Sequence, residues 1–206
     1  MTARIPGNKL GVFWGGKGDQ TCLEVFCDFN CPFSNKICTT LFEVKKSFGS
    51  KLELVFLPTP QPWHPSSCMV HECYHAATAL SPSKTEDIFM YTMEIALQYF
   101  SDVDSYEMSR KAVHEQMADL YMAKGLVDKE AFLQAVRIEI PASGGEKNAG
   151  NEATRLVKMY TKHGRYSSIH VTPTTRVNGI ICDTSSSWTV EEFAVFLQPL
   201  VDAEGI

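Results

Sequence analysis

The chain begins with strand-like sequence and returns to it only near its end, after a long helix-like stretch over residues 66–165. Within this stretch the sequence predicts helices over 66–80, 85–100, 104–124, 128–139 and 146–163. Before that stretch, residues 21–29 and 51–57 are apolar or β-branched at strand length, and a helical pattern over 32–48 lies between them. This order predicts a right-handed crossover between parallel strands. After the stretch, Asn178-Gly179 predicts a hairpin, and a final helix begins at 189. We therefore expect an α/β fold, a central mixed sheet flanked by helices, with a large all-helical insertion.

Length and charge exclude several classes of protein. A chain of 206 residues can bury a large core without disulfides or a structural metal. The net charge of −5 argues against a nucleic-acid partner, because the basic residues look dispersed and offset by acids; they include Lys45, Lys46, Lys158, Lys162 and Arg165. No run of 18 or so apolar residues predicts a membrane span, and the first residues lack the apolar stretch of a secretory signal. A cytoplasmic protein is expected, and the oligomeric state stays open.

The seven cysteines include no C-x-x-C pair, so we expect most of them to be reduced thiols buried as small apolar side chains. Cys31 is the exception. It stands where the first long strand ends, and Pro32 follows it, a residue that suits the first turn of a helix. Unpaired N–H groups and the helix dipole stabilise a thiolate at such a position, which makes Cys31 the candidate nucleophile.

Two motifs, in this order and with helices between them, resemble the DsbA-like branch of the thioredoxin superfamily. The first is V-F-C-D-F-N-C-P-F-S over 25–34, similar to the family's strand leading into C-P-x-C. The second is V-T-P-T-T-R-V-N-G over 171–179, similar to the family's T-P-T stretch with its cis-proline. The resemblance implies a thioredoxin fold in two parts, 1–62 and 166–206, around a helical insertion domain over 63–165.

The sequence departs from this family at Ser34, which occupies the place of the second cysteine. In this respect it also resembles the glutathione transferase kappa and hydroxychromene-carboxylate isomerase group, whose motif has the form S-P-x-S and whose members bind glutathione.

The resemblance implies a thiol-disulfide oxidoreductase-like protein in which Cys31 and Ser34 are the catalytic residues. It also implies that Pro32, Phe33, Thr172 and Pro173 contact substrate, with a cis bond before the proline. Since Ser34 cannot form a disulfide, we expect a monothiol mechanism in which Cys31 forms mixed disulfides.

Such a mixed disulfide needs another thiol to resolve it. Glutathione, a client thiol or another cysteine of this chain can serve. Cys38 is a poor partner, because a helix places it roughly 10 Å from Cys31. No cofactor is required, glutathione is a candidate co-substrate, and the expected partner is a protein or peptide bearing thiols or a disulfide. Two alternatives stay open: a kappa-type glutathione transferase or isomerase, and a catalytically silent binding protein.

A rival signal is His71-Glu72-Cys73-Tyr74-His75, which matches the H-E-x-x-H motif of zinc proteases. Cys68 lies on the same helix face. Ligands from one short helix rarely enclose zinc, so we expect no metal and read the segment as an amphipathic helix. His64 and Glu24 stay open, the first as a loop residue or a thiolate stabiliser, the second as a carboxylate beneath the active site.

Overall fold

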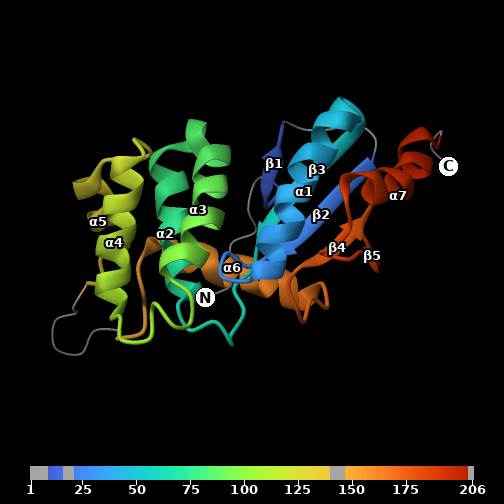
Figure 1. Cartoon of the computed structure of the whole chain (residues 1–206). Helices are drawn as coiled ribbons and strands as arrows, with labels where there is room; N and C mark the ends of the chain where they lie inside the picture. The colour runs from blue at the N-terminus through green and yellow to red at the C-terminus, as the bar shows by residue number, and fades with distance from the viewer. Residues whose placement is uncertain (1–8, 16–20, 140–146, 204–206) are drawn as a thin grey trace.

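The computed structural model describes residues 9–15, 21–139 and 147–203. Its strands form one five-stranded sheet in the order β1-β3-β2-β4-β5. Figure 1 shows the sheet at one end of the molecule and a group of helices at the other. The strands are β1 (Val12–Trp14), β2 (Thr21–Cys27), β3 (Leu52–Pro58), β4 (Thr174–Val177) and β5 (Ile180–Cys182).

The predicted crossover is present. Strand β2 is followed by α1 (Pro32–Phe48), a short 3-10 turn (Gly49–Lys51) and β3, which pairs with β2 in parallel. Strand β4 lies antiparallel to β2 on its other side, so β2 is central in the sheet. The predicted hairpin also forms, because Asn178 and Gly179 adopt the positive φ angles, 49° and 85°, that a two-residue turn requires.

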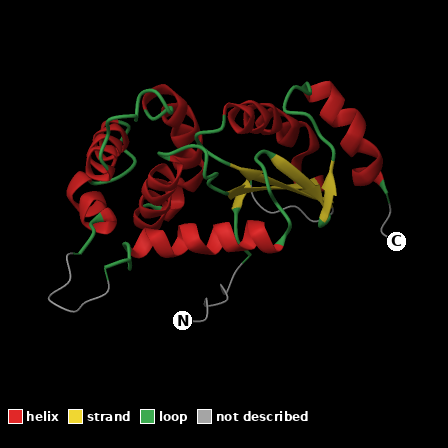
Figure 2. Cartoon of the chain, turned by 90° about the horizontal axis from the view of Figure 1, so that it is seen from below, coloured by secondary structure: helices red, strands yellow, loops and turns green. Residues whose placement is uncertain are grey.

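Helices cover both faces of the sheet, as Figure 2 shows. Val25 of β2 faces the large core that includes residues of α1 and α7 (Val190–Asp202). The next residue, Phe26, faces a smaller core that contains Tyr160 of α6 (Glu152–Tyr166). Successive side chains of a strand point to opposite faces, so this apolar pair buries β2 on both sides.

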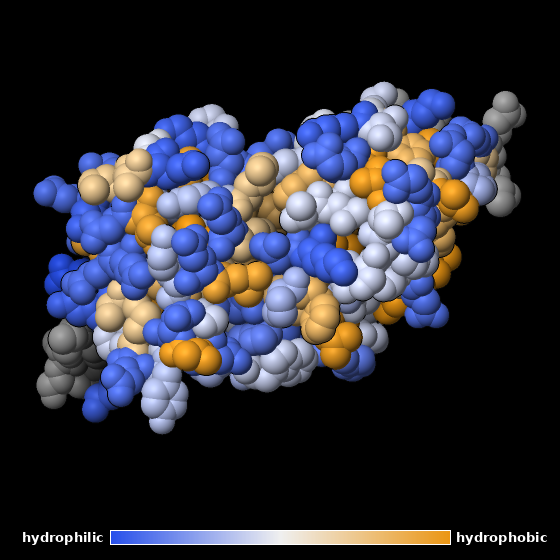
Figure 3. Space-filling view, in the orientation of Figure 1, coloured by the Kyte–Doolittle hydropathy of each residue, from blue (hydrophilic) through white to orange (hydrophobic). Residues whose placement is uncertain are grey.

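The helical insertion follows β3 and contains α2 (Ser67–Leu80), a 3-10 turn (Pro82–Lys84), α3 (Thr85–Tyr99), α4 (Arg110–Ala123) and α5 (Lys129–Val136). Helix α6 then packs on α2 and also covers the sheet, so it joins the insertion to the strands. In the part of the chain that the structure describes, no helix is long and apolar enough to cross a membrane. Figure 3 shows a face that is largely hydrophilic, with separate apolar patches.

Two predicted helix starts are wrong, and local capping explains both. The helix expected from residue 104 begins at Arg110, because the Ser109 hydroxyl caps it and the preceding residues form turns. The helix expected from residue 146, which itself lies outside the described residues, begins at Glu152. There Asn151 and Thr154 cap each other reciprocally, and residues 147–151 are not helical.

Candidate functional site

Cys31 occupies the N-cap of α1, at the end of a tight turn after β2. Its backbone is extended (φ −87°, ψ 116°), and Pro32 is the first helical residue. The Cys31 N–H donates to the Asp28 carbonyl at 3.1 Å, which closes the turn. The side chain is 4% exposed. The sequence thus places the cysteine at the positive end of a 17-residue helix whose first turn contains no acidic side chain.

The second predicted motif meets the first at this point. The Thr172-Pro173 bond is cis. The Cys31 thiol donates to the Thr172 carbonyl oxygen at 3.3 Å, although 141 positions separate the two residues. Around this contact Phe33 and Val171 are exposed, at 61% and 56%. The structure therefore joins the predicted nucleophile to the predicted substrate-binding loop.

Ser34 lies in the first turn of α1 and is fully buried. Its hydroxyl oxygen accepts a hydrogen bond from the Asp28 backbone N–H at 3.2 Å. A hydroxyl also carries one proton that it can donate. Ser34 therefore helps to fix the turn through its oxygen and keeps a donor for a second contact.

Asp28 is one of two residues at this site whose roles the sequence interpretation missed. Its carboxylate is completely buried and accepts hydrogen bonds from the backbone N–H of Asn30 at 3.0 Å and of Gln61 at 2.7 Å. The Ser67 hydroxyl donates a third, at 2.7 Å. Buried carboxylates are rare unless paired, and this one is satisfied by donors from the turn, from the loop after β3 and from α2. The sequence signal that could have found it is an acidic residue placed between an apolar strand and the candidate nucleophile.

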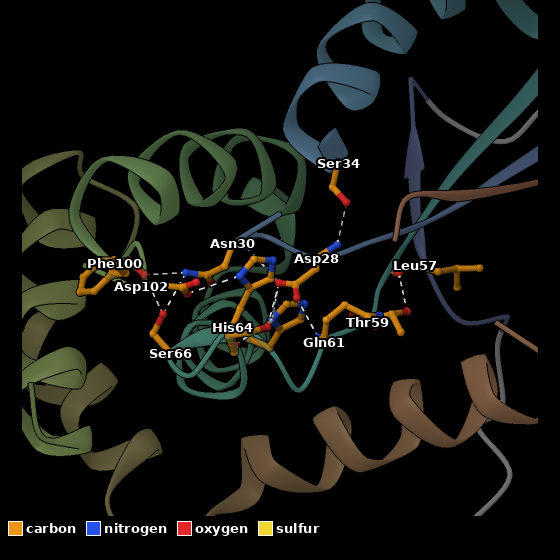
Figure 4. Close-up of polar contacts among 12 residues, drawn as sticks. Asp28, Asn30, Ser34, Leu57, Thr59, Gln61, His64, Ser66, Phe100 and Asp102 are labelled. Carbon is orange, nitrogen blue, oxygen red and sulfur yellow. Dashed lines mark hydrogen bonds and ion pairs between the residues drawn. The ribbon is translucent and has the colours of Figure 1, made fainter. Parts of the chain in front are cut away.

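Asn30 extends this network into the insertion, as Figure 4 shows. Its side-chain amide donates to the Ser66 hydroxyl at 2.9 Å and to the Phe100 carbonyl at 2.7 Å. Ser66 precedes α2 and Phe100 follows α3, so the turn that presents Cys31 is braced by the ends of two insertion helices. Rigid support of this kind keeps a nucleophile in one geometry.

Three of the other cysteines, Cys22, Cys38 and Cys73, lie in surroundings that oppose thiolate formation. Burial and the neighbouring Cys27 thiol raise the pKa of Cys38 well above its ordinary value. Burial also raises the pKa of Cys73 strongly, and burial together with Glu24 and Glu53 raises that of Cys22 to about 12. All seven cysteines are free thiols. These shifts agree with the expectation that Cys38 is a poor resolving partner for Cys31.

The H-E-x-x-H residues have structural partners. His71 and His75 are buried, with a His71 Nδ1 contact to the Ser67 carbonyl at 2.8 Å and His75 stacked on Tyr160 at 4.9 Å. Burial lowers the pKa of both imidazoles, that of His75 to about 3. Glu72 pairs with Arg110 of α4. Among the described residues, no three His, Cys, Asp or Glu side chains are grouped to hold a metal ion.

The polar partners of Glu24 and His64 are residues other than Cys31. Both carboxylate oxygens of Glu24 accept from the Arg176 guanidinium, at 2.7 and 2.8 Å, across the β2–β4 pair. His64 Nδ1 lies 3.4 Å from an Asp102 carboxylate oxygen, which ties the loop before α2 to the segment after α3. Their contacts are those of structural residues.

Comparison with known proteins identifies the fold. No family model and no curated protein sequence matches the chain. A solved structure from Pseudomonas syringae, described as a protein-disulfide isomerase, is 24% identical over 86% of this chain and 93% of its own, with a TM-score of 0.66.

Two further structures are similar at lower identity. The thiol-disulfide exchange protein alpha-DsbA2 of Wolbachia pipientis is 13% identical over 89% of this chain and 85% of its own, with a TM-score of 0.62. Oxidised BdbD of Bacillus subtilis is 14% identical over 89% and 88%, with a TM-score of 0.61. The suggested link to the kappa group stays a prediction. The chain therefore has a thioredoxin-like fold with a helical insertion, the fold that it shares with these solved structures.

Proposed function

We propose that this protein exchanges disulfides with thiol-bearing client proteins through Cys31 as its single active thiol. The observation that carries the proposal is the contact of the Cys31 thiol, at the N-cap of α1, with the Thr172 carbonyl of the cis-proline loop at 3.3 Å. Ser34, at the second position of the motif, cannot form a disulfide with Cys31.

The reaction follows from a single thiol. The Cys31 thiolate attacks one sulfur of a client disulfide, a new S–S bond joins client and enzyme, and the second client sulfur leaves as a thiolate. A second thiol, from the client or from glutathione, then attacks the mixed disulfide and regenerates the Cys31 thiolate. Without a resolving cysteine the protein stores no oxidising equivalent. The proposed activity is therefore isomerisation or glutathione-dependent reduction.

The surroundings of Cys31 favour both the thiolate and a client chain. The first N–H groups of α1 have no intrahelical partner, and they face an anion at the N-cap. Exposed apolar side chains flank the thiol on two elements, Phe33 on α1 and Val171 beside the proline loop. An extended client segment with apolar residues on either side of its cysteine suits this surface.

Resolution by a thiol from outside is favoured over an internal one. Cys27 and Cys38 are fully buried, and burial together with the neighbouring Cys27 thiol raises the pKa of Cys38. A protonated, buried thiol is a slow nucleophile. The adduct should thus persist until glutathione or a client thiol arrives.

The test is incubation of the reduced protein with glutathione disulfide and with a disulfide-bonded peptide, followed by intact and peptide mass spectrometry. We expect one adduct, on Cys31, that is reversed by reduced glutathione. Cys31→Ser should form none, and the matched variant Cys68→Ser should form it normally. An adduct confined to another cysteine, or undiminished in Cys31→Ser, would rule out the proposal.

A further inference from the structure

A cavity of about 410 Å³ opens between α2, α4 and α6, on residues that the proposed chemistry does not use. Apolar side chains, Met69 and Val157, form part of its wall. The cationic part consists of Arg110 from α4 and Lys158, Lys162 and Arg165 from α6. Its size lies in the ordinary range for sites that bind small molecules.

The three cationic residues on α6 lack counter-charges. The side chains of Lys158, Lys162 and Arg165 are exposed and make no hydrogen bond or ion pair with any residue that the structure describes. Their spacing places them on one face of the helix, where like charges repel one another. The sequence alone predicts that these residues are dispersed and offset by acids, and for these three the prediction is wrong. In a chain with a net charge of −5, such a group is unusual.

Among the described residues that line the cavity, the one acid, Glu72, does not neutralise them, because its charge is already paired. The Glu72 carboxylate accepts from the Arg110 guanidinium and the Thr154 hydroxyl, and His114 Nε2 lies 3.6 Å away. Burial alone would raise the pKa of Glu72, but these partners outweigh it and hold the pKa below its ordinary value. Glu72 is therefore ionised at neutral pH, and it balances Arg110 only.

Arg110 adds a donor that has no acceptor. Its Nη2 bonds Glu72, whereas its Nε–H is buried and has no partner among the described residues. A buried donor without a partner is destabilising, and an acceptor atom on a ligand would satisfy it. The cavity thus combines uncompensated positive charge with an unused hydrogen-bond donor.

We infer that this cavity binds a small molecule that carries a diphosphate group. Arginine and lysine together are the usual ligands of phosphate oxygens. From Lys158 to Arg165 the charges extend over about 10 Å of helix, at 1.5 Å per residue, which is longer than one phosphate. The diphosphate of a nucleoside diphosphate and inorganic pyrophosphate both present the phosphate oxygens that these cations would bind. The apolar wall would in addition accommodate the organic group of a nucleoside diphosphate.

The experiment is isothermal titration calorimetry of the full chain with inorganic pyrophosphate at low ionic strength. We expect saturable binding at one site per chain. Orthophosphate should bind at least about tenfold more weakly, because it reaches fewer of the cations. Adenosine diphosphate in a parallel titration separates the two sources: tighter binding indicates a nucleoside diphosphate, and equal binding indicates that the diphosphate alone is recognised.

Lys158→Gln combined with Lys162→Gln should weaken pyrophosphate binding at least about tenfold. The matched control, Lys46→Gln with Lys111→Gln, removes the same charge from residues that do not line the cavity and should bind normally. Arg165→Gln alone gives an independent measurement and should weaken binding severalfold. Cys31→Ser should bind as the unmodified chain does, so this test is separate from that of the proposed exchange reaction.

Three results would overturn the inference. They are the absence of saturable pyrophosphate binding, an equal loss in the control double variant, and orthophosphate affinity equal to that of pyrophosphate. The substituted lysines are exposed, so circular dichroism should show native folds for both double variants.

Discussion

Cys31 and Cys68 both lie at the start of a helix, but they differ in burial, in contacts and in the charges near them. Cys31 is the N-cap of α1, almost fully buried, beside the Thr172 carbonyl, and no acidic residue lies in the first turn. Cys68 is the second residue of α2 and is exposed. Partial burial of its thiol and the negative charges of Glu72 and Asp28 raise its pKa. A helix start therefore does not suffice to activate a thiol, since burial of the sulfur and nearby carboxylates can outweigh its effect.

The largest expected effect comes from exchanging the two cysteines for serine, one at a time. Cys31→Ser should lower the rate of thiol-disulfide exchange at least about 10³-fold, because the attacking sulfur is gone. Cys68→Ser should leave the rate within about twofold. The rate of reduction of a fluorogenic disulfide peptide by glutathione, with each variant as catalyst, measures both. Equal losses in the two variants would remove the distinction between the sites.

Asp28→Ala should lower the free energy of unfolding by about 3–5 kcal/mol, because three donors are left without their buried acceptor. Urea denaturation measures the change. The matched control is Asp119→Ala, which removes an exposed acid paired with Lys129 and should cost at most about 1 kcal/mol. A loss at Asp28 no greater than at Asp119 would show that the network does not hold the turn.

Ser34→Cys should convert the monothiol site into a dithiol site. The introduced thiol lies in the first turn of the helix that Cys31 caps, and it can attack the mixed disulfide and release the client. We expect the lifetime of the Cys31–glutathione adduct to fall at least about tenfold, with an internal disulfide as product. Stopped samples analysed by mass spectrometry follow both species. An unchanged lifetime would argue that geometry, and not only the missing cysteine, prevents resolution.

The buried histidines of the H-E-x-x-H segment make stability depend on pH. Burial lowers the folded-state pKa of His75 to about 3, so the unfolded chain binds a proton more readily. The stability that the neutral imidazole contributes is complete above about pH 6.5 and is lost as the pH falls toward 3. Between pH 7 and pH 5 the loss from His75 should be about 2 kcal/mol.

Urea denaturation at pH 7 and at pH 5 tests whether the free energy of unfolding falls as the pH is lowered. His75→Gln should show a smaller difference between pH 7 and pH 5 than the unmodified chain, by about 2 kcal/mol. The exposed His170→Gln should show the same difference as the unmodified chain. Greater stability at pH 5 than at pH 7 would contradict a neutral, buried His75.

The smallest expected effect concerns Cys68. Glu72→Gln removes a negative charge that raises the pKa of this thiol, although burial is the larger cause. Alkylation of Cys68 at pH 8 should therefore accelerate only about two- to fivefold. Glu115→Gln, on the exposed side of α4, is the control and should have no effect. A slower reaction in Glu72→Gln would reverse the electrostatic argument.

The sequence predicted those features that depend on local signals. Apolar runs of strand length, the proline after Cys31 and the Asn178-Gly179 turn led to the order of elements, and the two motifs led to Cys31 and Thr172. The roles of Asp28 and Asn30 were missed, because their partners lie on segments far along the chain, such as Ser67 and Phe100.

Two further features could not be predicted from the sequence, because they depend on burial and on contacts between segments that are far apart in the chain. The spacing of His71 and His75 fits a metal helix and a core helix equally well, and only the packing of α2 on α6 distinguishes them. Lys158, Lys162 and Arg165 look ordinary in sequence. They become a group of uncompensated charges only when α2 and α4 place Glu72 and Arg110 together and leave the three without an acid.

The most direct test of the account compares the alkylation rates of Cys31 and Cys68 in one sample. The reduced protein is treated with iodoacetamide at pH 7, and the modification of each cysteine is followed by peptide mass spectrometry. Cys31 should react at least about tenfold faster, although Cys68 is the more exposed thiol. Faster reaction of Cys68 would show that accessibility decides thiol reactivity in this protein, and it would contradict the assignment of Cys31 as the active thiol.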